Sequence, residues 1–182
     1  MSYKVAVLVG SVDPDSLNRR LAKAMELAAP DSLEFVEVPI DELPFYQSKY
    51  DREPTEGGSR ARELVKSSDA VLIVTPEYNR SMPAVLKNAL DWLSRPIGES
   101  AFMDKPVLIA GASGGAIGTA AAQAQVRSVV PMLGGVIFGS PELYIQITKD
   151  QFAEDGTAAK EGTQDFLATA MEKFAGAVEK MS

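Results

Sequence analysis

Four short segments of the chain are apolar at every position: residues 5–9, 70–74, 107–110 and 136–138. Runs of this length without polar alternation are typical of strands that are buried on both faces of a parallel sheet. A fifth run, residues 33–38, is interrupted by Glu34 and Glu37, so part of its surface tolerates water. We therefore predict five strands and place the 33–38 strand at an edge of the sheet.

Between these runs, apolar residues recur at intervals of three and four, which is the spacing of an amphipathic helix. The stripes consist of Leu17, Leu21, Ala24 and Ala28; of Ala61, Leu64 and Val65; of Leu86, Ala89, Leu90 and Leu93; and of Leu167, Ala170, Phe174, Val178 and Met181. In the third helix, Pro83 suits the first position and Ser81 is a possible cap. Strands that alternate with helices form βαβ units. The sequence thus predicts an α/β fold, a flavodoxin-like three-layer αβα sandwich whose five-stranded parallel sheet has the order 2-1-3-4-5.

Length and charge narrow the possibilities. At roughly 150 residues per domain, a chain of 182 residues is expected to form a single domain, residues 1–182. The net charge of −7 argues against nucleic acid and against anionic membranes as partners. The N-terminal apolar run is too short for a signal peptide, and no run of about 18 apolar residues occurs. We therefore expect a cytoplasmic protein without a membrane span.

Two residue types are missing altogether, because the chain contains neither Cys nor His. Disulfides, thiolate nucleophiles and iron–sulfur clusters are therefore excluded. A Ser-His-Asp triad, a His-ligated metal and an imidazole proton shuttle are excluded as well, and we predict no metal site. The chemistry has to run on carboxylates, hydroxyls, Lys, Arg and backbone amides, or on a molecule that the protein binds.

Ligands of open α/β sheets bind at the carboxyl ends of the strands, and three unusual loops follow strand ends here. The first loop, residues 10–18, offers the hydroxyls of Ser11 and Ser16 and the amide of Asn18. Together with the N-terminus of the following helix, these groups suit a phosphate. The spacing matches neither of the common glycine-rich nucleotide motifs, so a plain turn with Ser16 as N-cap fits equally well.

The same loop contains the acidic sequence Asp13-Pro14-Asp15, and Thr75 follows the third strand. A D-x-D sequence in this place is similar to haloacid-dehalogenase-type phosphatases. In those enzymes the nucleophilic Asp stands directly at the strand end, whereas residues 10–12 intervene here. A Mg²⁺-dependent phosphatase is therefore the weaker alternative.

The second loop, residues 75–83, contains two prolines that fix its backbone. Such a loop can present a hydrogen-bonding edge to a planar ring, although a stiff structural turn fits as well. The third loop begins with Gly111-Ala112-Ser113-Gly114-Gly115, which matches the G-x-S-x-G nucleophile elbow. Because the chain has no His, Ser113 would lack a base. We therefore interpret this loop as a glycine-rich turn that brings backbone amides to a ligand.

Several motifs occur together in these loops and in the segments beside them. They are Gly10-Ser11 through Ser16-Leu17-Asn18-Arg19; Thr75-Pro76-Glu77-Tyr78-Asn79-Arg80-Ser81 with Pro83; Leu86-Lys87-Asn88-Ala89; Asp91-Trp92; Lys105-Pro106-Val107; and Ser113-Gly114-Gly115. In this combination the chain resembles the NAD(P)H-dependent FMN reductase family, which includes quinone and chromate reductases. The resemblance covers nearly the whole chain.

The resemblance implies FMN as cofactor and NADPH or NADH as co-substrate. It implies that the FMN phosphate is held by Ser11, Ser16, Leu17 and Asn18, that the isoalloxazine edge is lined by Pro76, Glu77, Tyr78 and Asn79, and that Ser113, Gly114 and Gly115 close over it. Hydride would pass from nicotinamide to flavin and on to quinones, flavins or other small acceptors. Since the flavin carries the redox steps, no catalytic side chain is expected.

For the pyridine nucleotide, Arg80 and Arg95 are candidate contacts, although each could equally be a solvated side chain or a subunit contact. The resemblance also implies a homodimer or homotetramer. Leu86, Leu90 and Leu93 could contribute to the subunit interface, or they could cover the sheet.

The chain departs from the family at Asp13, where an Arg is usual, so that an anion replaces a cation near the expected phosphate. Arg19 or Arg20 could compensate. A second class of function also stays open, namely a flavodoxin-like electron-transfer module that does not oxidise NAD(P)H itself.

Overall fold

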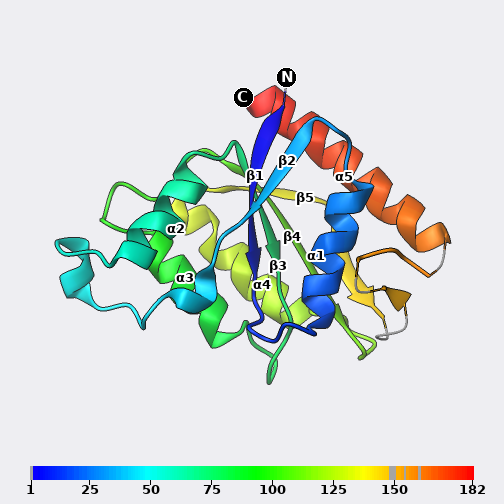
Figure 1. Ribbon diagram of the computed structural model, residues 1–182, viewed down its shortest axis with the longest axis horizontal. Helices are drawn as coiled ribbons and strands as arrows, with labels where there is room; N and C mark the ends of the chain where they lie inside the picture. The colour runs from blue at the N-terminus through cyan, green and yellow to red at the C-terminus, as the bar shows by residue number, and fades with distance from the viewer. Residues whose placement is uncertain (1, 148–150, 154, 160) are drawn as a thin grey trace.

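The computed structural model describes residues 2–147, 151–153, 155–159 and 161–182 (Figure 1). Its strands are β1 Tyr3–Val9, β2 Leu33–Glu37, β3 Ala70–Val74, β4 Pro106–Ser113 and β5 Val136–Gln146. They form a sheet in the order β2-β1-β3-β4-β5, and each neighbouring pair is parallel. The predicted strand order and direction are confirmed.

The helices in the described residues are α1 Leu17–Ala28, α2 Glu56–Lys66, α3 Ala84–Leu93, α4 Ala120–Val129 and α5 Glu161–Met181. Helices α1 and α5 cover one face of the sheet, while α2, α3 and α4 cover the other (Figure 1). This confirms the three-layer αβα sandwich. In the parts of the chain that the structure describes, no helix is long and apolar enough to cross a membrane.

Strand β1 shows why the central strands are apolar throughout. Val5, Val7 and Val9 pack in the core beneath α1 and α5, whereas Ala6 and Leu8 pack in the core on the side of α2 and α3. Since successive side chains of a strand point to opposite faces, a strand that is covered on both faces has no position for a polar residue. Strand β2 at the edge leaves its two glutamates exposed, as its sequence predicts.

Two elements differ from the sequence pattern. Strand β5 continues to Gln146, although its apolar run ends at Phe138. Because β5 is the other edge strand, its residues 139–142 are not buried and need not be apolar. Helix α4 is absent from the predicted elements, because its buried side chains are only Ala122, Gln123 and Val126, a stripe too short and too polar to stand out.

The start of α3 also differs from the prediction. Pro83 occupies the cap position without a side-chain hydrogen bond. The hydroxyl of Ser81 donates instead to Oε1 of Gln125 on α4, at 2.8 Å, so the capping role predicted for Ser81 is wrong. The three leucines of α3, Leu86, Leu90 and Leu93, are fully buried against the sheet. They cover the sheet and are not available to a second subunit.

The single tryptophan, Trp92 of α3, anchors the long segment between β2 and α2. Its indole N–H donates to the carbonyl of Pro44 at 2.8 Å, and the ring of Tyr50 stacks on it with a centroid separation of 4.7 Å. A Cβ at Gly58 of α2 would overlap the indole ring. Trp92 therefore holds this segment and α2 together.

Candidate functional site

The loops after β1, β3 and β4 leave the sheet at the carboxyl ends of the strands, toward which the strand arrows point (Figure 1). Gly10 N–H donates to the Val74 carbonyl at 2.8 Å, and Thr75 N–H donates to the Ala110 carbonyl at 2.9 Å. A Cβ at Gly10 would lie 3.2 Å from Thr75 Oγ1, and a Cβ at Gly111 would overlap the Thr75 carbonyl oxygen. Glycine at these two positions therefore lets the three loops approach one another closely.

The β1–α1 loop presents hydrogen-bond donors at the N-terminus of α1. Asp13 N–H donates to Ser11 Oγ at 3.4 Å, and Asn18 N–H donates to Ser16 Oγ at 3.2 Å, so Ser16 is the N-cap of α1. A hydroxyl that accepts a hydrogen bond still has its own proton to donate. The first N–H groups of a helix, which begin here at Leu17, also lack partners within the helix. These donors lie at the positive end of the helix dipole, where an anion is stabilised.

The carboxylate of Asp13 is turned back toward its own loop. Asp13 is exposed, and its Oδ1 accepts the N–H of Asp15 at 2.9 Å. This is the local turn that an Asp side chain commonly forms with the backbone two residues on. Because β1 ends at Val9, residues 10–12 separate Asp13 from the strand end, and the structure does not give it the place of the phosphatase nucleophile.

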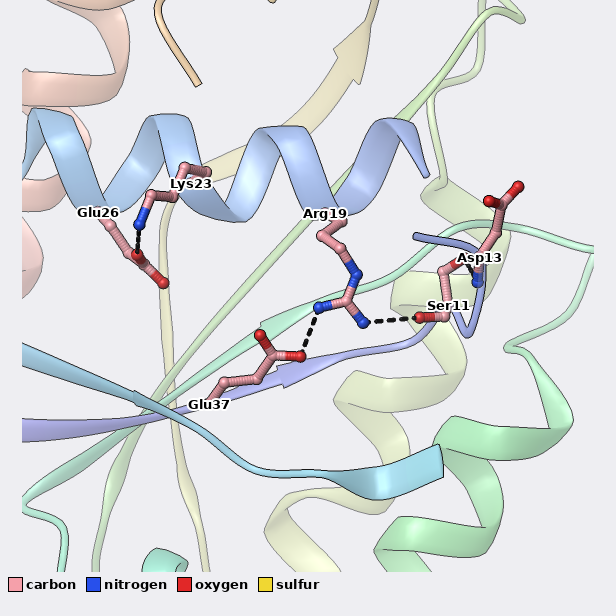
Figure 2. A network of polar contacts seen from close by, with 6 residues as sticks. All are labelled: Ser11, Asp13, Arg19, Lys23, Glu26 and Glu37. Carbon is pink, nitrogen blue, oxygen red and sulfur yellow. Dashed lines mark hydrogen bonds and ion pairs between the residues drawn. The ribbon is translucent and has the colours of Figure 1, made fainter. Parts of the chain in front are cut away.

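The cationic side chain of Arg19 contacts this loop. Figure 2 shows its guanidinium between β2 and the β1–α1 loop: Nη1 lies 2.5 Å from Glu37 Oε1, and Nη2 donates to the Ser11 carbonyl at 3.4 Å. Arg20 points elsewhere and donates to the carbonyl of Phe152 at 3.2 Å. Of the two arginines expected to offset Asp13, Arg19 therefore reaches the loop, with part of its charge engaged by Glu37.

Glu26 lies farther along α1 and lines a cavity of about 350 Å³ together with Asp15, Arg19 and Glu37. Lys23 Nζ lies 3.4 Å from Glu26 Oε2 (Figure 2). Burial raises the pKa of the Glu26 carboxyl, and Lys23 lowers it again only in part. The carboxylate of Glu26 is therefore less stable in the folded chain than in the unfolded one.

We expect Glu26→Gln to gain stability over the wild type as the pH rises above about 4.5, the ordinary pKa of the group. Because the pKa of Glu26 is higher in the folded state, the folded wild type binds more protons than the unfolded chain between the two pKa values. The free energy of unfolding of the wild type therefore falls as the pH rises through this range. Gln does not titrate, so the variant does not lose this part of its free energy of unfolding. The gain is small, because the exposed part of the group is screened by solvent. Thermal unfolding from pH 4 to pH 7 measures it, and a constant difference between the proteins would contradict it.

The β3–α3 loop ends in a tight turn. Tyr78 and Ser81 exchange two backbone hydrogen bonds of 3.0 Å, and between them Asn79 and Arg80 have φ angles of 52° and 64°. Positive φ at both central residues is the mark of a type I′ turn. The turn leaves Tyr78, Asn79 and Arg80 exposed at the edge where the three loops meet.

The base of this loop is tied to α4. Glu77 Oε2 accepts the N–H groups of Ala121 and Ala122 at 2.9 and 3.2 Å. Gln125, farther along α4, accepts the N–H of Met82 at 3.1 Å in addition to the Ser81 hydroxyl. The Glu77 side chain is thus directed at a helix N-terminus, which its place in the sequence motif does not reveal.

Asn18 connects the first loop with β4. Its Nδ2 donates to the Ala112 carbonyl at 2.9 Å, and its Oδ1 accepts the Ala112 N–H at 2.8 Å. The register of β3 against β4 ends at Val74 and Ala110, so the Asn18 carboxamide continues the pairing where β3 has stopped. The side chain is only 2% exposed. Its carboxamide therefore holds β4, whereas its backbone N–H stays at the start of α1.

The turn after β4 is open to solvent. Gly114 and Gly115 are exposed, and the Ser113 hydroxyl oxygen accepts the Gly115 N–H at 2.9 Å. The Ser113 carbonyl accepts the N–H of Ile147 at 3.1 Å, which ties the turn to the end of β5. The turn offers an accessible backbone, as its glycines predict.

The structure does not bring Arg80 and Arg95 together. Arg80 lies at the tip of the β3–α3 loop, whereas Arg95 lies two residues beyond the end of α3. A helix of 10 residues is ~15 Å long, so α3 separates the two arginines. Arg95 lies 5.4 Å from the ring centre of Tyr46 and 4.0 Å from Asp51, beside a cavity of about 240 Å³ that Trp92 also lines. Within one chain, Arg95 does not face the three loops.

Residues 3–150 match the family described as NADPH-dependent FMN reductase. The chain belongs to this family. It is 45% identical over 175 residues to the 2-hydroxy-1,4-benzoquinone reductase of a Burkholderia species, over 96% of each protein. It is 42% identical over 178 residues to the quinone reductase of Pseudomonas putida, over 97% of this chain and 95% of that protein.

A solved structure agrees with this family. The flavoenzyme NAD(P)H:(acceptor) oxidoreductase FerB from Paracoccus denitrificans superimposes with a TM-score of 0.93 at 40% identity, over 98% of both chains. The expected family, the oxidoreductase class and the use of FMN with NAD(P)H are thereby confirmed for this FMN reductase.

Proposed function

We propose that this FMN reductase oxidises NADPH or NADH and passes the electrons through FMN to quinones or other small acceptors, with residues 1–182 acting as one FMN-binding domain. Two relatives above 40% identity are named for quinone reduction, and each aligns with almost the whole chain, which supports a quinone as acceptor. Free flavins are a second acceptor class, in keeping with the family description.

The observation that carries the proposal is the set of donors at the start of α1. A phosphate there would receive the hydroxyls of Ser11 and Ser16 and the backbone N–H of Leu17, and it would share the Asn18 N–H that Ser16 Oγ accepts. At the neighbouring start of α4, the carboxylate of Glu77 already accepts the amides. The donor set of α1 fits the phosphate of FMN, and α4 offers no comparable place.

The other two loops fit the ring. We propose that the backbone of residues 76–79 lines the isoalloxazine edge, with the exposed side chains of Tyr78 and Asn79 beside it, and that Ser113, Gly114 and Gly115 close over the other side. Their backbone donors need no titrating side chain. When bound, FMN supplies the redox chemistry by accepting hydride from nicotinamide and releasing electrons to the acceptor. The chain binds, orients and shields the reactants.

Arg80 is a candidate contact for the anionic part of NAD(P)H, because it is exposed at the tip of the β3–α3 loop. Arg95 can take that role only if a second subunit brings it to the site.

We further propose a homodimer or homotetramer. Ile97 and Met132 are 80% and 78% exposed and line one shallow cavity together with the exposed Met103. Clusters of exposed apolar side chains of this kind commonly mark subunit contacts. Analytical ultracentrifugation of the wild type and of the double variant Ile97→Ser/Met132→Ser checks the assembly, and we expect the variant to be a smaller oligomer. If both proteins form the same oligomer, the subunit contact lies elsewhere.

Anaerobic stopped-flow mixing tests the proposed function. The protein loaded with FMN is mixed with NADPH or NADH, and the flavin absorbance is followed before and after addition of 1,4-benzoquinone. We expect bleaching by the nicotinamide and recovery by the quinone. If dithionite bleaches the flavin but neither nicotinamide does, the chain is an electron-transfer module. If FMN fluorescence is not quenched in a titration, the FMN site itself is wrong.

A further inference from the structure

Helix α4 receives its N-terminal cap from another part of the chain. Thr119 occupies the cap position of α4, but its side chain makes no capping hydrogen bond. Its Oγ1 accepts from Gln123 Nε2 at 3.0 Å instead, in the tight space beside Gly111. The Glu77 carboxylate takes the amides of Ala121 and Ala122, the second and third residues of the helix, which an N-cap side chain normally binds.

The same helix also holds the far side of the β3–α3 loop. Gln125 Oε1 accepts from the Ser81 hydroxyl and from Met82 N–H, and Gln125 Nε2 donates to the Arg80 carbonyl at 3.4 Å. The loop is therefore fixed to α4 at two places, at Glu77 before its type I′ turn and at residues 80–82 in and directly after the turn. We call these contacts the α4 clamp.

The clamp joins two segments that the proposed function places around one ring. The β3–α3 loop carries residues 76–79, and the turn 113–118 leads directly into α4. Because Glu77 binds the first turn of α4, its carboxylate determines how far the loop stands from that turn. A carboxylate at the positive end of a helix is stabilised by the helix dipole, so the contact is strong for a partly buried pair.

We propose that Glu77 is a positioning residue for FMN: through α4, its carboxylate holds the β3–α3 loop at the spacing in which the loop backbone meets the isoalloxazine edge. The inference rests on the proposed function. It predicts that loss of the Glu77 acceptor weakens the binding of reduced FMN more than the binding of oxidised FMN. Negative charge grows on the ring upon reduction, and well-placed donors stabilise that charge.

The test compares Glu77→Ala with Glu77→Gln, which keeps an acceptor oxygen at the same reach. In Glu77→Ala we expect reduced FMN to lose about tenfold more affinity than oxidised FMN, which lowers the two-electron midpoint potential by ~30 mV. In Glu77→Gln we expect the wild-type potential within about 10 mV. Fluorescence titration gives the affinity for oxidised FMN, and a dye-coupled redox titration gives the potential.

Thr55→Ala is the matched control. Thr55 caps α2 by accepting the Gly58 N–H at 3.1 Å, away from the three loops. Its loss removes a single uncharged capping hydrogen bond, so the Tm falls but the potential stays unchanged. An unchanged potential in Glu77→Ala would overturn the proposal, as would an equal shift in Glu77→Gln. If Glu77→Ala does not fold, Gln125→Ala releases the other side of the loop and has to lower the potential as well.

A measurement without FMN separates this inference from the proposed function. In the apoprotein, hydrogen exchange at the amides of Ala121 and Ala122 becomes faster in Glu77→Ala and stays slow in Glu77→Gln. If the wild type fails to bind FMN, the proposed function is wrong. If it binds FMN but these amides exchange at the wild-type rate in Glu77→Ala, the clamp is wrong.

Discussion

Gly111→Ala is expected to lower the free energy of unfolding by about 3 kcal/mol, the upper end of the cost of overpacking. The added Cβ would overlap two atoms at once, Thr119 Oγ1 and the backbone carbonyl oxygen of Thr75. The hydroxyl can rotate away, but the carbonyl belongs to the end of β3 and cannot move without shifting the β3–α3 loop. For a chain of this size the loss corresponds to a fall in Tm of ~6–12 °C.

Calorimetry on the apoprotein measures this loss, with Gly139→Ala of β5 as the control. A Cβ at Gly139 meets nothing within 4 Å, so the same substitution in the neighbouring strand tests the effect of the residue type alone. The FMN affinity should fall together with stability in Gly111→Ala, because Thr75 begins the proposed ring-binding loop. Equal Tm values for the two variants would show that the strand ends separate easily.

Asn18→Leu is expected to cost about 2–6 kcal/mol. Leu fills a similar volume but leaves the N–H and the carbonyl of Ala112 without their partners, and each buried unpaired group costs about 1–3 kcal/mol. Because Ala112 immediately precedes the Ser113 turn, we also expect FMN to bind more than tenfold more weakly. Chemical denaturation and FMN titration measure the two effects.

Asn88→Leu provides the comparison that separates stability from cofactor binding. Asn88 is also buried and bonds only backbone groups, accepting the Tyr46 N–H at 2.8 Å and donating to the Pro44 carbonyl at 3.1 Å. These contacts hold the segment before α2 and not the three loops. The variant should lose comparable stability but keep the wild-type affinity for FMN. A parallel loss of FMN affinity would mean that the effect of Asn18→Leu reflects general destabilisation.

The sequence predicts the fold best at strands that are buried on both faces, because only apolar residues are tolerated there. Val5 to Val9 of β1 lie between two cores and carry no polar side chain, so the strand is evident. Strand β5 lies at an edge and α4 buries a polar Gln123, so neither needs an uninterrupted apolar pattern. The length of β5 and the existence of α4 therefore depend on tertiary contacts that local patterns do not record.

The candidate site was predictable to the level of its loops, because every parallel strand delivers its loop to the same edge. The roles of single side chains within the loops could not be predicted from the sequence. Asn18 bonds a residue 94 positions away, and Glu77 bonds one 44 positions away. The contact of Gln125 with the β3–α3 loop is not predictable, because the sequence pattern does not indicate the helix that carries this residue. No local signal distinguishes a carboxylate that caps a distant helix from one that faces a ligand.

The position of Trp92 makes the intrinsic fluorescence of the chain a signal from one place. The chain has no other tryptophan, and this one is stacked on Tyr50 and bonded to Pro44 at the end of α3 opposite to the three loops. Its emission wavelength therefore reports whether the segment between β2 and α2 is docked. FMN at the strand ends would reach the indole by energy transfer and lower its intensity without moving the spectrum. Spectral position and intensity thus report two different events in one optical experiment.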